Sequence, residues 1–309
     1  MVRAADARRS RWGILAATAL VVSIALGTDP AEARGRRGTW LPYSPPYAAI
    51  VVDANTGQIL HADKADRLRH PASLAKIMTL FLLFEQLDAG TLKLDSPLSV
   101  SSRAARQEPS KLGLTPGATI EVEDAIKALV IRSANDAAVV VAEAIAGDEV
   151  SFAKLMTRKA RSLGMSRTIY RNASGLPHRE QVTTATDQAL LGRLIQDRFP
   201  SHYHYFSTPK FDYRGVSSRN HNQLLGRVEG VDGIKTGYTR DSGFNIIISV
   251  RRDSRRIIAV VLGGASSRDR DARMRDLIAE HLTHAKSVRR PGTTSGTSDI
   301  TQTARQNRF

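Results

Sequence analysis

Ser73-Leu74-Ala75-Lys76 lies at the start of a predicted helix, and Ser133-Ala134-Asn135 and Lys235-Thr236-Gly237 follow it far along the chain. A Ser-x-x-Lys, a Ser-x-Asn and a Lys-Thr-Gly in this order describe a serine acyl-transfer site whose base is a lysine rather than a histidine. Each segment alone carries little information, because such short patterns also arise by chance. The ordered set of three is the strongest signal in the chain.

Ser73 and Lys76 share one face of this helix. Apolar residues at helical spacing after Pro71 predict a helix that ends at Gly90. Residues three apart on a helix can touch, and a serine hydroxyl needs an adjacent base to be a good nucleophile. The Lys76 amine is a base only when neutral, so burial or a nearby cation, for which Lys235 is a candidate, must lower its pKa. The alternative is a helix-capping serine and a solvated lysine.

Ser133 and Asn135 fall in a predicted turn between helical stretches 123–131 and 137–145. A hydroxyl at Ser133 can relay a proton, and the Asn135 amide can orient Lys76 and hold a substrate carbonyl. Alternatively, one of the two residues simply caps the second helix.

The Lys235-Thr236-Gly237 segment belongs to a predicted strand, residues 233–239. Gly237 allows a ligand or another backbone to approach closely. Acyl transfer needs two donors aimed at the developing oxyanion, and we expect these to be the backbone amides of Ser73 and Tyr238. The alternative is an edge strand with a solvated lysine that protects the edge.

Predicted strands lie at both ends of the chain, with helices between them. The strands are expected at 48–53, 58–62, 231–236, 245–250 and 256–262, and the last helix at 269–284. We therefore predict one α/β unit over residues 47–284, in which the N-terminal hairpin and the C-terminal strands share an antiparallel sheet flanked by the first and last helices. An all-helical subdomain of about residues 91–200 is inserted into it.

The two ends of the chain differ from this unit in composition. Residues 1–33 combine a basic start, an apolar run of about 14 residues and a terminal Ala-x-Ala pattern, which predicts a cleaved signal peptide. An uncleaved N-terminal anchor is the alternative. Residues 34–46 are expected to form an extended lead-in, and 285–309 a disordered polar tail without the apolar face of a membrane-anchoring helix. We expect an exported, soluble protein of the periplasm or cell envelope.

The chain is strongly basic, with a formal net charge of +15 over 309 residues. Residues 1–33 hold four arginines and three acids, so the remainder keeps a charge of +14. Export and the absence of any nucleic-acid motif argue against nucleic acid as a partner. An anionic cell-wall or envelope surface fits better, and a solvated basic surface without a partner is the alternative. With no cysteine and no evident cluster of metal ligands, we expect neither a metal nor a cofactor.

Four segments resemble one enzyme family, over about residues 47–284. They are His70-Pro-Ala-Ser-Leu-Ala-Lys76-Ile-Met-Thr79, Ser133-Ala-Asn-Asp-Ala-Ala138, Asn172-Ala-Ser-Gly-Leu-Pro177 and Val231-Asp-Gly-Ile-Lys-Thr-Gly-Tyr-Thr239. The chain is similar to the penicillin-recognising serine enzymes, and more narrowly to the low-molecular-mass D-alanyl-D-alanine carboxypeptidases.

This resemblance implies a mechanism. Ser73 would attack the carbonyl between the two terminal D-alanines of a peptidoglycan pentapeptide while Lys76 takes its proton. Ser133 would pass a proton to the leaving D-alanine, and water would then hydrolyse the acyl-enzyme. β-Lactams would acylate Ser73 and leave slowly, and no metal is implied.

The family also implies an arginine that holds the substrate carboxylate, just after the penultimate strand-to-helix turn. By spacing from the strand we prefer Arg270 to Arg268 for this role. The alternative is a solvated arginine at a helix start. Better-known members continue into a β-rich second domain and an amphipathic anchor helix, and the residue between Ser133 and Asn135 is here Ala134.

Related activities stay open. A class A β-lactamase needs an extra glutamate in a loop before the Lys-Thr-Gly strand, and the only acid between residues 160 and 180 is Glu180. We therefore rank a β-lactamase well below a carboxypeptidase. A D,D-endopeptidase that cuts peptidoglycan cross-links would share the catalytic residues. A non-catalytic wall-binding or β-lactam-sensing protein is disfavoured, because all the polar groups for catalysis are present.

Overall fold

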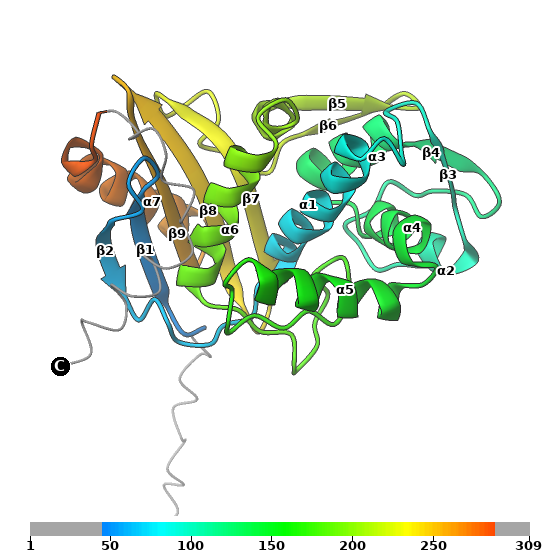
Figure 1. The fold of residues 1–309 in the computed structure, drawn as a ribbon, viewed down its shortest axis with the longest axis horizontal. Coiled ribbons are helices and arrows are strands. Elements are labelled where there is room, and N and C mark those ends of the chain that lie inside the picture. The colour runs from blue at the N-terminus through cyan, green and yellow to red at the C-terminus, as the bar shows by residue number, and fades with distance from the viewer. Residues whose placement is uncertain (1–44, 288–309) are drawn as a thin grey trace, which may run out of the picture. The chain divides into compact units, whose positions relative to one another are not determined.

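The computed structural model describes residues 45–287 (Figure 1). The predicted signal peptide 1–33, residues 34–44 of the lead-in and residues 288–309 of the tail lie outside these described residues. Within residues 45–287, no helix combines the length and the apolar character that crossing a bilayer requires.

A five-stranded antiparallel sheet joins the two ends of the described chain, as predicted. Its strand order is β2-β1-β9-β8-β7. The strands are β1 (Ala48–Asp53), β2 (Ile59–Asp63), β7 (Val231–Thr239), β8 (Gly243–Arg252) and β9 (Arg255–Gly264). The runs of Val, Ile and Ala in β1, β8 and β9 are apolar on both faces, as strands covered on both sides must be. β7 lies at one edge of the sheet, so one side of its backbone faces the helical part of the molecule.

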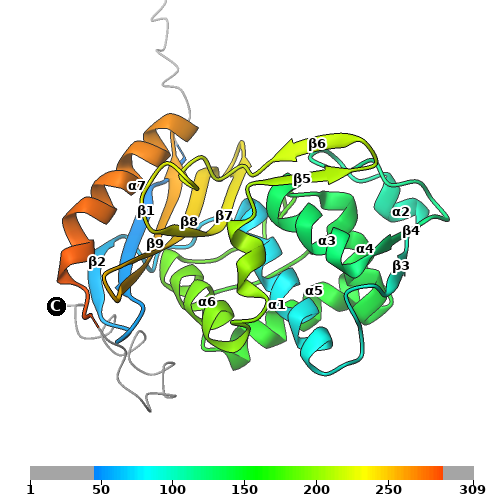
Figure 2. The same cartoon turned by 90° about the horizontal axis from the view of Figure 1, so that it is seen from above.

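Helices cover both faces of the sheet, and Figure 2 shows α6 (Ala185–Arg198) and α7 (Ser267–His281) on opposite sides. Met274, Leu277 and Ile278 of α7 pack on one face in a core cluster with β1, β8 and β9. On the other face α6 approaches so closely that a Cβ at Gly192 would lie 2.5 Å from Ile247 Cδ1. The prediction that residues up to about 200 belong to the helical subdomain is therefore wrong for α6, which packs on the sheet. The sequence of an amphipathic helix does not show which layer its apolar face contacts.

The remaining elements form the helical part beside β7. They are η1 (Ala72–Leu74), α1 (Ala75–Asp88), α2 (Ser102–Ala105), α3 (Val122–Lys127), a π-helical turn (Ala128–Arg132), α4 (Asn135–Ala146), α5 (Glu149–Ser162) and η3 (Tyr203–Ser207), with the two-stranded sheets β3 (Pro97–Ser99)–β4 (Thr119–Glu121) and β5 (Lys210–Tyr213)–β6 (Val216–Arg219). The last element, η4 (Leu282–His284), follows α7 and packs with it on the sheet. Every residue of α1 from Ala75 to Phe84 is buried, so this helix runs through the core instead of lying on the surface. Its start, η1, packs against β7 and β8.

The packed chain extends slightly further than predicted. Ala285 is buried, and the Lys286 amide donates to Asp53 Oδ2 at 3.0 Å while the Lys286 carbonyl accepts from Asn55 Nδ2 at 2.8 Å. The polar tail therefore begins after Lys286 rather than at 285. Composition alone misses this boundary because the contacts are made by the small side chain of Ala285 and by the backbone of Lys286.

Candidate active site

Lys76 lies in the first turn of α1 and is completely buried. Its Nζ is 2.7 Å from Asn135 Oδ1, 2.5 Å from the Ser174 carbonyl oxygen and 3.3 Å from Ser73 Oγ. The predicted pairing of Ser73 with Lys76 is thus present. The alternative of a solvated lysine is wrong, and neither η1 nor α1 has a side-chain cap, so Ser73 does not cap the helix either.

These three contacts determine what the amine can do when it is neutral. A neutral amine has two N–H donors and one lone pair. The Asn135 and Ser174 oxygens are acceptors only, so each takes one N–H. The lone pair then points to the third partner, and Ser73 donates its hydroxyl proton to Nζ. The surroundings of Lys76 therefore orient it as a base toward Ser73.

The electrostatics of the site favour this neutral form. Burial lowers the pKa of Lys76 well below its ordinary value of 10.5, and the charge of Lys235 lowers it further. Asp136 and Glu149 act in the opposite direction. Burial is the largest of these effects, so the amine loses its proton far below the pH at which a solvated lysine would.

Ser133 lies in the turn before α4, and Asn135 is the first residue of that helix. Ser133 has a left-handed backbone with φ of 58°, and its buried Oγ has no hydrogen-bond partner among the described residues. Asn135 Oδ1 accepts a hydrogen bond from Lys76, and Asn135 Nδ2 donates one to the Glu108 carbonyl oxygen at 2.8 Å. Neither residue caps α4, because that helix has no side-chain cap. The Ser133 hydroxyl is thus available to a ligand.

The edge strand β7 closes the site from the other side. A Cβ at Gly237 would lie 3.0 Å from the Ser73 nitrogen, so the glycine lets the strand approach η1 closely without displacing it. This contact brings the amide of Ser73 beside the strand that carries Tyr238, as an oxyanion-binding pair requires. Lys235 is 1% exposed, which overturns the alternative of a solvated edge lysine.

Lys235 and Arg270 form a second cationic pair. Burial and the charge of Arg270 lower the pKa of Lys235 to about 7. Arg270 is itself buried, and Asp271 holds its guanidinium through contacts of 2.9 and 2.7 Å to Oδ1. Arg268 is exposed. The spacing argument thus selects the arginine that reaches the site, and its alternative, a solvated helix-start residue, is wrong. An anion bound beside this pair would favour the protonated form of Lys235.

These residues surround one cleft of about 550 Å³. Its lining includes Ser73, Ser133, Asn135, Thr236, Gly237, Tyr238 and Arg270. Lys76 and Lys235 contribute from buried positions. The structure therefore brings together all nine residues that the sequence singled out.

Three contributions to the site are not predicted by the sequence, although Ser174 and Asp136 belong to segments that carry the family resemblance. The loop 172–177 supplies the Ser174 carbonyl to Lys76. Asp136 accepts the backbone N–H groups of Leu112, Gly113 and Leu114, which holds the neighbouring 108–114 loop at the cleft. His221 is a further residue of the cleft lining. Partial burial of its ring and then nearby cations, Lys235 first among them, lower its pKa to about 4. Only the Asn-x-x-Gly turn of the first loop leaves a trace in the sequence.

The five-stranded sheet with its flanking helices is the fold of the low-molecular-mass penicillin-binding proteins. The chain belongs to the D-alanyl-D-alanine carboxypeptidase family, peptidase S11, whose family model matches residues 45–266.

Relatives with known names support the assignment. The chain is 32% identical over 236 residues to D-alanyl-D-alanine carboxypeptidase DacF of Bacillus subtilis, covering 75% of this chain and 60% of that protein. It is 35% identical over 230 residues to DacC of Escherichia coli, covering 72% and 58%. The chain thus spans about three fifths of the length of these two relatives.

Solved structures share the fold. The D-alanyl-D-alanine carboxypeptidase DacD from Francisella tularensis superposes with a TM-score of 0.74 at 30% identity, covering 78% of this chain and 70% of that one. Penicillin-binding protein D2 from Listeria monocytogenes, in its ampicillin-bound form, gives a TM-score of 0.69 at 32% identity, covering 75% and 95%.

Proposed function

We propose that this protein is a serine-type D-Ala-D-Ala carboxypeptidase that removes the terminal D-alanine from peptidoglycan pentapeptides and is inhibited by β-lactams. The observation that carries the proposal is the geometry of Lys76, whose two carbonyl acceptors leave its third position for Ser73. Membership of the family and the ampicillin-bound Listeria relative support the choice of substrate and inhibitor.

In this mechanism Lys76 takes the Ser73 proton as Oγ attacks the carbonyl between the two D-alanines. The amides of Ser73 and Tyr238 stabilise the oxyanion. Ser133 donates its proton to the amine of the leaving D-alanine as the C–N bond breaks, and it receives in return the proton that Lys76 had taken. Water then attacks the acyl ester, regenerating Ser73. Asn135 keeps Lys76 in place, and Lys235, Thr236 and Arg270 hold the terminal carboxylate.

Two assays test this function. Intact-mass analysis after penicillin treatment should show one added acyl group, absent in Ser73→Ala. Incubation with a D-Ala-D-Ala pentapeptide should release free D-alanine. Faster cleavage of purified cross-linked dimers than of pentapeptide would make the protein an endopeptidase. Acylation by penicillin without turnover of either peptide would make it a non-catalytic β-lactam-binding protein.

The role of Arg270 gives a substitution test. In Arg270→Ala, kcat/KM for the pentapeptide should fall about 100-fold, since a charge-assisted contact to the substrate carboxylate is lost. A peptide with an amidated C-terminus has no such carboxylate, so the variant should process it at the wild-type rate. Arg268→Ala is the matched control and should leave both substrates unaffected. An equal loss on both peptides would contradict the role of Arg270 in carboxylate binding.

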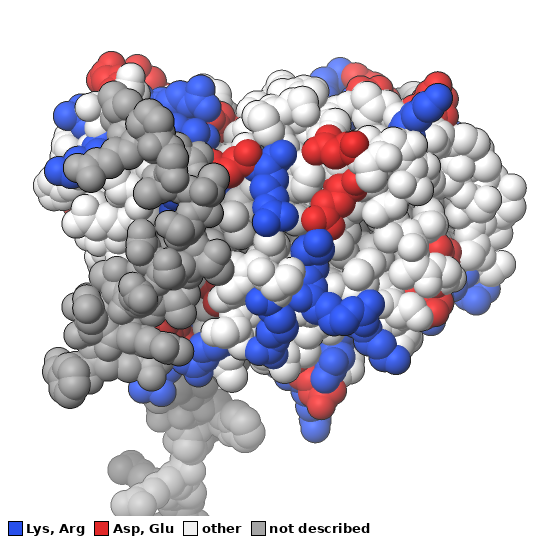
Figure 3. Space-filling view, viewed as in Figure 1, with Lys and Arg blue, Asp and Glu red and all other residues white. Residues whose placement is uncertain are grey.

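For localisation we propose export to the periplasm or cell envelope, with an anionic envelope polymer as a second partner. Figure 3 shows Lys and Arg side chains gathered over α5 and the segment that follows it. The exposed basic residues of α5 and of the segment up to residue 180 are called the basic face here, and they are Lys154, Arg158, Arg161, Arg167, Arg171 and Arg179. The first three recur at helical spacing on one side of α5. One residue of the basic face forms an ion pair: Arg171 Nε lies 3.0 Å from Glu180 Oε2.

Charge reversal tests this partner. The double variant Lys154→Glu/Arg158→Glu should bind purified cell-wall polymer about tenfold more weakly and with a weaker dependence on salt. The double variant Arg268→Glu/Arg275→Glu carries the same net charge and changes exposed residues of α7 instead. Equal losses in both variants would attribute the attraction to net charge alone and not to the basic face.

A further inference from the structure

The carbonyl of Ser174 is one of the two acceptors that orient Lys76, and it belongs to a loop. Within this loop, Asn172 Oδ1 accepts from the Gly175 amide at 2.7 Å and Nδ2 donates to the Leu176 carbonyl at 3.0 Å. These bonds shape the loop but do not attach it to α1. The position of the Ser174 oxygen against Lys76 therefore depends on what holds the loop from outside.

Two side chains hold the peptide units on either side of Ala173. Thr79, one turn after Lys76 on α1, donates its hydroxyl to the Ala173 carbonyl at 2.7 Å. Glu149 Oε1 accepts the Ala173 amide at 3.2 Å. The next carbonyl along the chain is the one that meets Lys76. Displacement of Ala173 would therefore move the acceptor of the catalytic amine.

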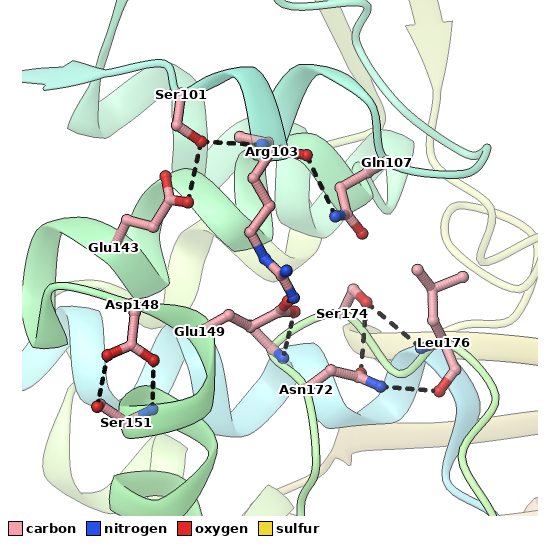
Figure 4. Close-up of polar contacts among 12 residues, drawn as sticks. Ser101, Arg103, Gln107, Glu143, Asp148, Glu149, Ser151, Asn172, Ser174 and Leu176 are labelled. Carbon is pink, nitrogen blue, oxygen red and sulfur yellow. Dashed lines mark hydrogen bonds and ion pairs between the residues drawn. The ribbon is translucent and has the colours of Figure 1, made fainter.

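Glu149 is not needed for the usual role of an acid at a helix start. The N-cap of α5 is Asp148, whose carboxylate accepts from the Ser151 amide at 2.8 Å and from its hydroxyl at 2.6 Å. Figure 4 shows Asp148 turned to Ser151 and Glu149 turned the other way, toward Arg103 and the loop. Glu149 is 5% exposed, so its carboxylate is placed in the interior at a cost that its contacts must offset.

Arg103 supplies the charge that makes this burial tolerable. Its Nη2 lies 2.7 Å from Glu149 Oε2, and the side chain is 59% exposed, so the arginine reaches in from the surface of α2. The oxygen bonded to Arg103 is not the one bonded to Ala173. The arginine thus fixes the carboxylate plane and leaves the second oxygen for the loop (Figure 4).

We propose that Glu149 is a positioning residue of the active site: held by Arg103, it anchors the Ala173 amide and thereby keeps the Ser174 carbonyl on the Lys76 amine. The inference deepens the proposed function, since it concerns the same base. Glu149 touches no substrate and acts through the loop.

Besides positioning the loop, Glu149 acts on Lys76 through its negative charge, which opposes the lowering of the Lys76 pKa. It raises the pKa of Lys76, as Asp136 does, whereas burial and Lys235 lower it, and His221 also faces this group of cations. Arg103 offsets the field of Glu149. Removing Arg103 should therefore favour protonated Lys76, and removing only the charge of Glu149 should favour the neutral amine.

Penicillin acylation over a range of pH tests the proposal. In Glu149→Ala the acylation rate should fall roughly 10- to 100-fold, because the carbonyl that orients Lys76 is misplaced. Glu149→Gln keeps an acceptor for Ala173 and should restore most of the rate, with the acid limb of the profile moved to lower pH. Arg103→Ala should move that limb to higher pH. Asp148→Ala, which removes the helix cap beside Glu149, should lower stability without moving the limb.

A second measurement does not depend on activity. Hydrogen exchange at the Ala173 amide should accelerate at least tenfold in Glu149→Ala and stay slow in Glu149→Gln and Asp148→Ala. Unchanged exchange and an unchanged pH profile in Glu149→Ala would overturn the proposal. If the wild-type protein fails to react with penicillin, the proposed function is wrong. The hydrogen exchange of the Ala173 amide in the Glu149 variants would still decide whether Glu149 positions the loop.

Discussion

Replacing Lys76 with methionine is expected to lower the rate of Ser73 acylation by penicillin about 1,000-fold or more. Methionine fills the buried volume but has no basic nitrogen, so Ser73 loses the acceptor that lies 3.3 Å from its Oγ. General-base catalysis of this kind contributes roughly 100- to 10,000-fold. Lys76→Arg should be as inactive, because a guanidinium stays protonated. Stopped-flow acylation with a fluorescent penicillin measures the effect.

Lys93→Met, at an exposed site, is the matched control and should be acylated at the wild-type rate. Thermal unfolding of each variant separates loss of the base from loss of the fold. A folded Lys76→Met protein that acylates within tenfold of wild type would show that Ser73 is activated by another group.

The second large effect is expected for Gly175→Ala. A Cβ at this residue would lie 1.9 Å from the Ala72 carbonyl oxygen and 2.9 Å from the Ser73 nitrogen, and φ is +86°. The loop and the Ala72–Ser73 peptide cannot both keep their positions, so the nucleophile, its amide and the Ser174 carbonyl all shift. We expect acylation to fall about 100-fold or more, with a loss of stability of about 2 to 4 kcal/mol.

Gly215 provides a control that isolates backbone strain. Its φ is +81°, but a Cβ at this residue would have nothing within 4 Å. Gly215→Ala should therefore carry the cost of the left-handed backbone, about 1 kcal/mol, without affecting acylation. Comparable acylation defects in the two variants would mean that strain, and not contact with the nucleophile's peptide, causes the loss.

Much of the fold and of the site can be predicted from the sequence. The long Val and Ile runs of β8 and β9 are typical of strands that are covered on both faces. The strand predicted at residues 48–53 coincides with β1. Lys76 and Lys235 can be found because the chemistry needs particular side chains at particular spacings. The family resemblance implies an arginine after the last strand, and the distance along the chain favours Arg270 over Arg268.

Other features depend on tertiary contacts that leave little trace in a single sequence. The Ser174 carbonyl is a backbone group, so no side chain reveals that it meets Lys76. Gly192 packs α6 on the sheet, yet a glycine inside a helix predicts no partner. Glu149 resembles an ordinary acid at a helix start until Asp148 is seen to fill that role. The short strands β5 and β6 are mostly polar, and their pairing escapes a search for alternating apolar residues.

The central claim is that Lys76 is neutral at working pH, and the pH dependence of Ser73 acylation at saturating penicillin tests it most directly. Saturation keeps the ligand's carboxylate beside Lys235, so changes in binding do not mask the base. Because the pKa of Lys76 is lowered well below 10.5, the reactive form is present above that lowered value. The account predicts a rate that reaches its plateau well below pH 10.5 and stays level as the solution becomes more alkaline. A rate that continues to climb until an ordinary lysine titrates, at about pH 10.4, would contradict it.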